Sequence, residues 1–211
     1  MEKRDQFTNW AIELQSLAQD GLAYGHDRFD LERYTRIREI ATEMMSAKTG
    51  LPIKQVKELF SSDDGYQTPK LAVRAAIFND EKILLVKETT DEHWSMPGGW
   101  CDPNLTTTEN CIKEVKEEAG REVEIEKVIA LIDKSVNVHN QKRVERAINC
   151  CSVFFLCKEL GGKFVVNTET TEYDYFDVDH LPPLSVNRTT ADEVKMCLKS
   201  AHDPHWQVIC D

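Results

Sequence analysis

Glu114, Glu117 and Glu118 lie within the short segment KEVKEEAG, and their spacing could bring their side chains together. On a helix, residues three and four apart lie on the same face, so these carboxylates would form one acidic patch. Like charges at this spacing repel each other by roughly a few tenths of a kcal/mol per pair. A helix selected for stability alone would interleave lysines. Lys113 and Lys116 lie nearby, so a solvated, charge-laced helix face is the alternative interpretation.

A pair of glycines upstream changes this balance. Gly98 and Gly99 permit a tight loop whose backbone can approach the helix and offer a carbonyl oxygen to a metal ion. Carboxylates, a carbonyl oxygen and water form the hard oxygen environment that suits Mg²⁺ or Mn²⁺. Such ions engage substrate phosphates, polarise a phosphoryl oxygen and activate water. The segment therefore predicts phosphoryl chemistry assisted by a divalent cation.

The elements that must position this segment begin at about residue 70, where the hydrophobic period becomes two. KLAVRAAIF and KILLVKE flank Asn79-Asp80-Glu81 in the pattern of a β-hairpin. Thr190 and Glu193 have capping-box spacing at the start of a last helix. Mixed strands with interposed helices predict an α/β or α+β sandwich in which helices flank a mixed sheet. The expected elements after the hairpin are a helix at 106–119, strands at about 122–133 and 145–158, a short strand after Gly161-Gly162, a strand within TEYDYFDVDHLPPL and a helix at about 190–201.

Up to about Phe60 the hydrophobic period is helical instead. A second helix is expected to open with Asp30 as its N-cap, with Phe29 packed on Tyr34 as a hydrophobic staple, and to end at Gly50. A short third helix is expected to start near Pro52. One face of the first helix contains Trp10, Leu14, Leu17 and Gly21.

SSDDGYQTP, residues 61–69, has the composition of a linker, which predicts a helical domain at 1–64 and a second domain at 65–211. The helices contain too few residues for a robust core of their own, so they must pack on the second domain or on another subunit. We expect a homodimer through these helices, with Trp10 and Tyr34 in a core. A partner-binding module is the alternative.

The composition limits the classes of partner. A net charge of −11 argues against long nucleic acid, whose binding needs clustered Lys and Arg, but it is compatible with a local basic pocket for a small anion. The seven cysteines form no CxxC pair, which favours free thiols in a reducing compartment. The charged N-terminus does not resemble a signal peptide, and no apolar run approaches membrane-spanning length. We therefore expect a cytoplasmic protein.

The segment from Gly99 to Arg121 resembles the Nudix box, written G-x5-E-x7-R-E-U-x-E-E-x-G-U, in which U is a bulky aliphatic residue. Gly99 matches the opening glycine, and EVKEEAG at 114–120 matches the core at the correct distance. WSMPGGW at 94–100 and the first hairpin also resemble the family. The resemblance covers roughly residues 70–200 and implies a Nudix-type α/β/α sandwich preceded by the small helical domain.

Three positions depart from the Nudix pattern. Leu105 stands where the family has a glutamate, and it can neither bind metal nor form a salt bridge. Lys113 replaces the arginine, which keeps a positive charge but loses the planar guanidinium fork. Arg121 occupies the final aliphatic position, with Val123 the nearest apolar residue. Because the glutamates of the helix remain, we expect an active enzyme whose loop is supported differently.

The resemblance also implies roles. Glu114 and Glu118 would be the leading ligands of Mg²⁺, or of Mn²⁺, with Glu117 a further ligand or helper, the Gly98 carbonyl completing the site and Lys113 supporting the carboxylates. The implied reaction is attack of water on a diphosphate linked to a nucleoside, giving a nucleoside monophosphate and a second phosphorylated product. The general base would be a box glutamate or an acidic residue on a later loop.

Several further residues are candidates for catalysis or substrate binding, and each also has an ordinary structural explanation. For the general base, Glu169 and Glu172 are the later-loop candidates, although each taken alone is better explained as an ordinary exposed acid. Arg74, in an apolar strand, could face a phosphate or pair with an acid. Trp94 or Trp100 could stack on a base or pack against the sheet. Positive charge at a strand start also comes from Arg143 and Arg146, and His139 is given no role.

The helical extension followed by this box resembles Nudix proteins that act on X-linked nucleoside diphosphates, and among them CDP-choline pyrophosphatases. ADP-ribose is the alternative substrate. Two other classes stay open: a catalytically silent Nudix-like ligand sensor, which Leu105 favours, and an enzyme that processes RNA ends, which the acidic net charge disfavours.

Overall fold

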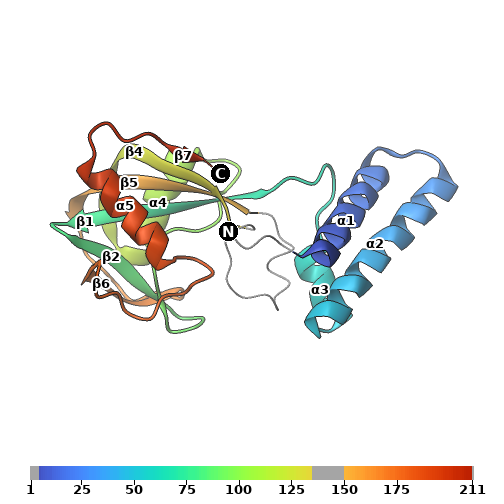
Figure 1. Cartoon of the computed structure of the whole chain (residues 1–211), viewed down its shortest axis with the longest axis horizontal. Helices are drawn as coiled ribbons and strands as arrows, with labels where there is room; N and C mark the ends of the chain where they lie inside the picture. The colour runs from blue at the N-terminus through green and yellow to red at the C-terminus, as the bar shows by residue number, and fades with distance from the viewer. Residues whose placement is uncertain (1–4, 135–149, 211) are drawn as a thin grey trace. The chain divides into compact units, whose positions relative to one another are not determined.

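The computed structural model describes residues 5–134 and 150–210, which group into two units (Figure 1). One unit contains the described residues up to Lys70 together with Asp133, Lys134 and Cys150. The other contains Leu71–Ile132 and the described residues from Cys151 onward. The first is helical, and the second is built around a β-sheet.

Three helices form the helical unit: α1 (Gln6–Tyr24), α2 (Arg28–Thr49) and α3 (Ile53–Phe60). Asp5 caps α1 by accepting a hydrogen bond from the Thr8 amide. Gly50 ends α2 in the left-handed conformation, as predicted. The buried core of the unit is small and consists of Ala11, Ala41, Met45, Val56 and Phe60.

The start of α2 and the packing of α1 differ from expectation. Asp27, rather than Asp30, caps α2, because its carboxylate accepts hydrogen bonds from the Phe29 and Asp30 amides. Phe29 therefore lies inside the first turn, largely exposed, and does not act as a staple. Tyr34 is half-buried against Gly21, where a side-chain carbon would lie 2.5 Å from the tyrosine ring. Trp10, expected in a core, is 53% exposed because it lies beside the buried face of α1 rather than on it.

The sheet has seven strands in the order β3-β2-β1-β5-β4-β7, and β6 also pairs with β2. β2 is antiparallel to β1, β3 and β6, whereas β4 and β7 are parallel. The sheet is therefore mixed, as predicted. Its strands are β1 (Lys70–Asn79), β2 (Lys82–Glu88), β3 (Trp94–Ser95), β4 (Arg121–Asp133), β5 (Cys150–Gly162), β6 (Thr170–Asp177) and β7 (Ile209–Cys210).

Helices α4 (Thr107–Ala119) and α5 (Ala191–His202) cover opposite faces of the sheet, as Figure 1 shows. β1 is buried on both faces: Val73 and Ala75 belong to the core cluster that contains Val115 of α4. Ala76 belongs to the cluster that contains Val194 of α5. This alternation follows from the two-residue period of a strand and makes the sheet unit a sandwich, which confirms the predicted fold class.

Both helices of the sheet unit begin with a capping box, of which only the second was predicted. Thr106 with Glu109 and Thr190 with Glu193 form complete capping boxes, and Gly120 ends α4 in the left-handed conformation. The short strand expected after Gly161-Gly162 is absent from the described residues, because β5 itself runs on to Gly162. Residues 145–149 of the predicted strand lie outside the described residues.

Among the cysteines, Cys111, Cys157 and Cys197 are buried free thiols, and Cys210 is an exposed one. Over residues 5–134 and 150–210, no helix is both long and apolar enough to cross a membrane.

Candidate functional site

The Gly98-Gly99 loop is held as an additional strand-like segment along β1. The Val73 amide donates to the Gly99 carbonyl at 2.9 Å, and the Ala75 amide donates to the Pro97 carbonyl at 2.8 Å. A side-chain carbon on Gly98, at φ +144°, would lie 2.1 Å from the Val73 carbonyl oxygen. One on Gly99 would lie 2.6 Å from Oε2 of Glu114. Gly98 therefore requires glycine, because its φ is positive and the backbone of β1 leaves no room, whereas a side chain at Gly99 would displace the Glu114 carboxylate.

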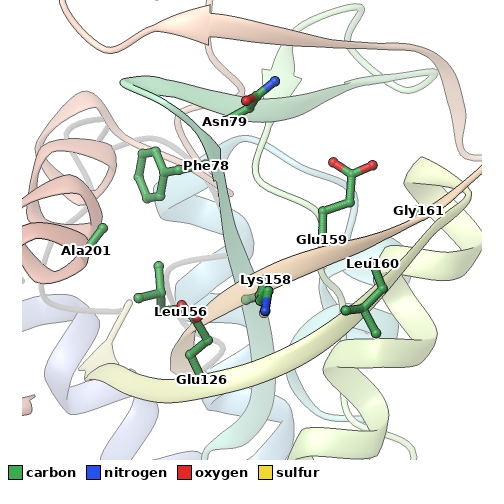
Figure 2. A pocket seen from close by; sticks show the side chains of 10 residues that line it. Phe78, Asn79, Glu126, Leu156, Lys158, Glu159, Leu160, Gly161 and Ala201 are labelled. Carbon is green, nitrogen blue, oxygen red and sulfur yellow. The ribbon is translucent and has the colours of Figure 1, made fainter.

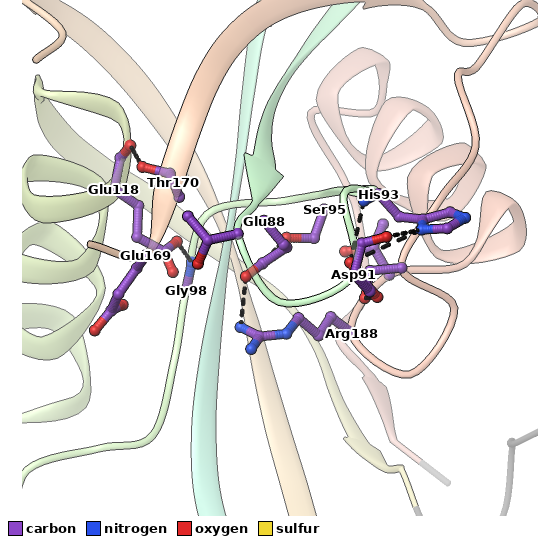
Figure 3. Close-up of polar contacts among 12 residues, drawn as sticks. Glu88, Asp91, His93, Ser95, Gly98, Glu118, Glu169, Thr170 and Arg188 are labelled. Carbon is purple, nitrogen blue, oxygen red and sulfur yellow. Dashed lines mark hydrogen bonds and ion pairs between the residues drawn. The ribbon is translucent and has the colours of Figure 1, made fainter. Parts of the chain in front are cut away.

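The α4 glutamates do not all point the same way. Glu114 and Glu118 are buried against the glycine loop, and Oε2 of Glu118 accepts a hydrogen bond from the Gly98 amide at 2.8 Å (Figure 3). Glu117 is mainly exposed and forms an ion pair with Lys113 at 3.2 Å. The helical spacing brought the carboxylates to one side of α4, but two face the loop and one faces solvent.

Burial destabilises the ionised form of the two inward carboxylates. It raises the pKa of Glu118 to about 8, against the lowering effect of the Arg74 charge and the Gly98 hydrogen bond. Burial likewise raises the pKa of Glu114, against the lowering effect of Lys113. A nearby cation would offset this cost of desolvation.

This donor set fits a hard divalent cation bound in part by its substrate. Within the described part of the chain, no three His, Cys, Asp or Glu side chains form a group that could by itself hold a metal ion. Two carboxylates and a backbone carbonyl are, however, what Mg²⁺ commonly takes from a protein, with water and phosphate oxygens completing the octahedron. Glu114, Glu118 and the Gly98 carbonyl could supply those protein ligands.

Lys113 shows how the loop is supported without the family's glutamate. Its Nζ lies 3.2 Å from Oδ2 of Asp102, 3.4 Å from Glu114 and 3.2 Å from Glu117. Asp102 therefore supplies, from the same loop, the carboxylate that Leu105 cannot. The sequence analysis missed Asp102, because an acid eleven residues before Lys113 has no periodic signal.

Asn110 is a second support that the sequence analysis missed. Its side chain is fully buried, and its Oδ1 accepts a hydrogen bond from the Asp102 amide at 2.8 Å. Its Nδ2 donates to the carbonyl oxygens of Asp102, Leu105 and Thr106 at 3.2, 3.3 and 3.0 Å. One amide thus fixes the loop that leads from the glycines into α4.

An ion pair between a buried acid and a half-buried arginine lies on the other side of Glu118. Glu88, at the end of β2, accepts a hydrogen bond from Ser95 Oγ at 2.5 Å and pairs with Arg188 at 3.1 Å (Figure 3). The Glu88 charge contributes to raising the pKa of Glu118. The sequence offered one weak signal, an acid ending the apolar strand KILLVKE, and none for Arg188.

The predicted substrate-contact residues do not all lie near the α4 glutamates. Arg74 is buried within electrostatic reach of Glu118 and Glu88, and its Nη1 has no hydrogen-bond partner among residues 5–134 and 150–210. Trp94 does not join the α4 residues: it packs edge-on against Phe176, at 4.6 Å between ring centroids, in the core cluster of α5. Trp100 is 55% exposed next to the glycine loop.

The later-loop acids also differ from each other. The negative charge of Glu169 contributes to raising the pKa of Glu114. Glu172 instead forms an ion pair with Lys87 at 2.8 Å. Arg143, Arg146 and His139 lie outside the described residues.

A hollow of about 680 Å³ lies elsewhere in the sheet unit (Figure 2). It is formed by β1, β4, β5 and the end of α5, through residues that include Phe78, Glu126, Leu156, Lys158 and Ala201. None of its lining residues belongs to α4 or to the glycine loop. Its size alone assigns it no function.

Comparison with known proteins places these features in a family. Residues 5–60 match a family model described as a UDP-X-like, N-terminal oligomerisation domain, and residues 68–195 match the NUDIX domain. The chain is 34% identical over 207 residues to the Bacillus subtilis (strain 168) protein YjhB, provisionally named an ADP-ribose pyrophosphatase, covering 97% of this chain and 98% of that protein.

Two solved structures are also similar. An ADP-ribose pyrophosphatase from Streptococcus suis 89-1591 is 44% identical with a TM-score of 0.61, covering 68% of this chain and all of that chain. A UDP-X diphosphatase is 30% identical with a TM-score of 0.61, covering the whole of both chains. With the matching domain spanning more than half of the sequence, the chain belongs to the Nudix hydrolase family.

Proposed function

We propose that this protein is a divalent-metal-dependent pyrophosphohydrolase that cleaves the diphosphate of a nucleoside diphosphate linked to a second group. One observation carries the proposal: the buried carboxylates of Glu114 and Glu118 face a loop in which Gly98 is sterically required and a side chain at Gly99 would displace the Glu114 carboxylate. A fold maintained for stability alone would have no need to bury two carboxyl groups beside each other.

In this proposal Glu114, Glu118 and the Gly98 carbonyl hold Mg²⁺, with Mn²⁺ as an alternative, and Glu117 assists from the exposed side. The bound cation would neutralise charge on the bridging phosphates and increase the acidity of water. Gly98 keeps Glu118 turned toward the loop through its amide. Lys113 links Asp102 to Glu114 and Glu117, so it fixes the loop and the helix relative to each other.

The reaction adds the oxygen of one water to a phosphorus atom and breaks the bond from that phosphorus to the bridging oxygen. Arg74 supplies a buried positive charge beside Glu118, where it favours anionic phosphate nearby. Trp94, which the sequence suggested as a substrate contact, has a different role in this proposal. Its backbone binds the segment after Pro183, through Trp94 N to Pro183 O and Ser185 N to Trp94 O, and so anchors the approach to the glycine loop.

The names of the relatives support the substrate class and rank the candidate bases. The CDP-choline-like substrate suggested by sequence resemblance would give CMP and phosphocholine. The names of the Bacillus subtilis and Streptococcus suis relatives favour ADP-ribose, and that of the full-length structural relative favours UDP-linked compounds. We therefore rank ADP-ribose and UDP-linked compounds ahead of CDP-choline.

We also propose that the helical unit forms a homodimer through α1. Trp10, Leu17 and Tyr24 are each more than half exposed and are spaced by seven residues, almost two full turns of helix. They form an apolar stripe separate from the buried face of α1. The match of this segment to a domain described by its oligomerisation supports the same interpretation.

The test is a substrate panel of ADP-ribose, UDP-sugars, CDP-choline and short or capped RNA, assayed with Mg²⁺, with Mn²⁺ and with chelator. The expected result is cation-dependent release of a nucleoside monophosphate from at least one of the nucleoside diphosphates linked to a second group. Cleavage of RNA ends alone would replace the proposal with RNA processing. Binding of a nucleotide without any product would replace it with a ligand sensor.

A further inference from the structure

The last turn of α4 is held by two side chains, one from the turn before β6 and one from the first residue of β6. Asn167 Nδ2 donates a hydrogen bond to the Glu117 carbonyl oxygen at 2.8 Å. Thr170 Oγ1 donates to the Glu118 carbonyl oxygen at 2.7 Å. The final carbonyls of a helix have no partner within the helix itself. These two are satisfied by residues that lie about fifty positions further along the chain.

Glu118 is consequently fixed at both ends. Its carboxylate accepts from the Gly98 amide at 2.8 Å, and its main-chain carbonyl accepts from Thr170, as Figure 3 shows. Thr170 and Glu118 are both buried, so water does not compete for the bond between them. Rotation or translation of the last turn of α4 would break one of these contacts.

The turn that supplies these donors is itself tightly determined. Asn167 Oδ1 accepts from the Glu169 and Thr170 amides at 2.9 Å each, and Asn167 Nδ2 also donates to Thr170 Oγ1 at 2.8 Å. Thr89 anchors the same turn to the end of β2, through its amide to Glu169 O at 2.8 Å and its hydroxyl to Thr168 O at 3.0 Å. Glu169 thus lies between two residues whose side chains donate hydrogen bonds to the last turn of α4.

We propose that Asn167 and Thr170 are positioning residues that join the last turn of α4 to the 167–170 turn as one rigid piece. The piece sets where the Glu118 carboxylate lies relative to the glycine loop, and it keeps Glu169 on the same side of α4. The inference rests on the proposed function of the α4 glutamates and adds to it the residues that aim them.

The chemistry of the two side chains is specific to this task. Asn167 uses both its amide donors and its carbonyl acceptor, which neither aspartate nor leucine can reproduce. Thr170 uses its hydroxyl as a donor to Glu118 and as an acceptor from Asn167, so serine can replace it and valine cannot.

The experiment compares Thr170→Val with Thr170→Ser, and uses Thr171→Val, an exposed neighbour on β6, as the matched control. Turnover is measured well below the melting temperature, together with Mn²⁺ binding in the absence of substrate and amide exchange at Ala119 and Gly120. We expect Thr170→Val to lower kcat about tenfold, with a much smaller change in KM, to weaken Mn²⁺ binding several-fold and to speed exchange at these amides. Thr170→Ser and Thr171→Val should behave like the unmodified protein.

Two results would overturn the inference: unchanged kcat and Mn²⁺ binding in Thr170→Val, or equal damage in Thr170→Ser, which would indicate lost methyl packing. Should Thr170→Val fail to fold, Asn167→Asp replaces it, since it keeps the size and the acceptor while removing both donors. Its effect on Mn²⁺ binding then decides in the same way.

Failure of this inference is separable from failure of the proposed function. If Glu118→Gln is inactive while Thr170→Val is fully active, the site stands and the positioning role falls. If Glu118→Gln remains active, the proposed site falls, and with it the catalytic meaning of the Thr170 contact, whatever the amide exchange shows.

Discussion

The helical unit leaves Trp10, Leu17 and Tyr24 more than half exposed on α1, whereas the sheet unit buries Glu88 and Glu118 almost completely. Exposed aromatic and aliphatic surface loses roughly 25 cal/mol per Å² that burial would provide. A buried carboxylate loses its hydration and needs a compensating charge. The two units thus contain opposite unfavourable features: exposed apolar side chains in the helical unit and buried carboxylates in the sheet unit.

Under the proposed function, the difference corresponds to what each unit binds. Apolar surface arranged in a stripe along α1 is satisfied by another apolar surface, and a second copy of the same helix provides one. Inward carboxylates are satisfied by a cation, and a cation in turn attracts phosphate. The two costs therefore correspond to assembly in one unit and to catalysis in the other, and each can be tested by removing it.

Removing the buried charge should have the largest effect. Glu118→Gln should lower kcat at least about a hundredfold, the scale of losing one preorganised electrostatic group, while keeping the fold, because glutamine can still accept the Gly98 amide. Steady-state kinetics and circular dichroism measure the two parts. Glu124→Gln, an exposed change on β4, is the matched control, and equal turnover of the two variants would contradict the assignment.

Removing apolar surface from α1 should act on assembly and leave the folded sheet unit unchanged. Leu17→Glu should raise the dimer dissociation constant by at least about thirtyfold, because central apolar contacts typically contribute about 2 kcal/mol or more. Sedimentation velocity over a concentration series measures this shift. Phe29→Glu, an equally exposed position on α2, should leave the constant unchanged. A strictly monomeric unmodified protein would remove the comparison altogether.

The loop before α4 should show an intermediate effect. Asn110→Ala should lower the free energy of unfolding by about 1–3 kcal/mol, because it removes a fully buried amide and leaves the half-buried Asp102 amide without its acceptor. Urea unfolding followed by fluorescence measures the change. Asn104→Ala, an exposed change in the same loop, serves as control. If both variants unfold alike, the loop is supported by Lys113 and not by Asn110.

The exposed charges of the helical unit should matter least. The Lys48 hydrogen bond, aided by Thr8, lowers the pKa of Asp5 from 3.8 to about 2. A folded pKa below the unfolded one stabilises the protein above about pH 4, and this contribution disappears as the pH falls through about 2. Asp5→Asn should therefore weaken amide protection in α1 by roughly a few tenths of a kcal/mol at pH 7, since the pair is exposed, and by less at pH 3. A difference that grows toward acid would contradict this sign.

Local features of the sequence were enough to predict the helix that carries the glutamates, the capping box of the last helix, the first hairpin and the mixed sandwich. Each depends on contacts between neighbours along the chain: hydrophobic periods of two or 3.6, a threonine three residues before a glutamate, a glycine where φ must be positive. The Nudix spacing added the family. The same local logic failed at Asp30, because Asp27 offered an equivalent cap three residues earlier.

Which side chains meet across the chain was decided only by the tertiary structure. Helical spacing puts Glu114, Glu117 and Glu118 on one side of α4, but the position of the glycine loop determines that Glu114 and Glu118 are buried and Glu117 is not. The support from Asn167 and Thr170 crosses about fifty residues, and no period or spacing can report such a contact. The sequence by itself determined the chemistry at hand, because residue types are local. Only folding determined which groups share a site, because burial and distance belong to the whole packed chain.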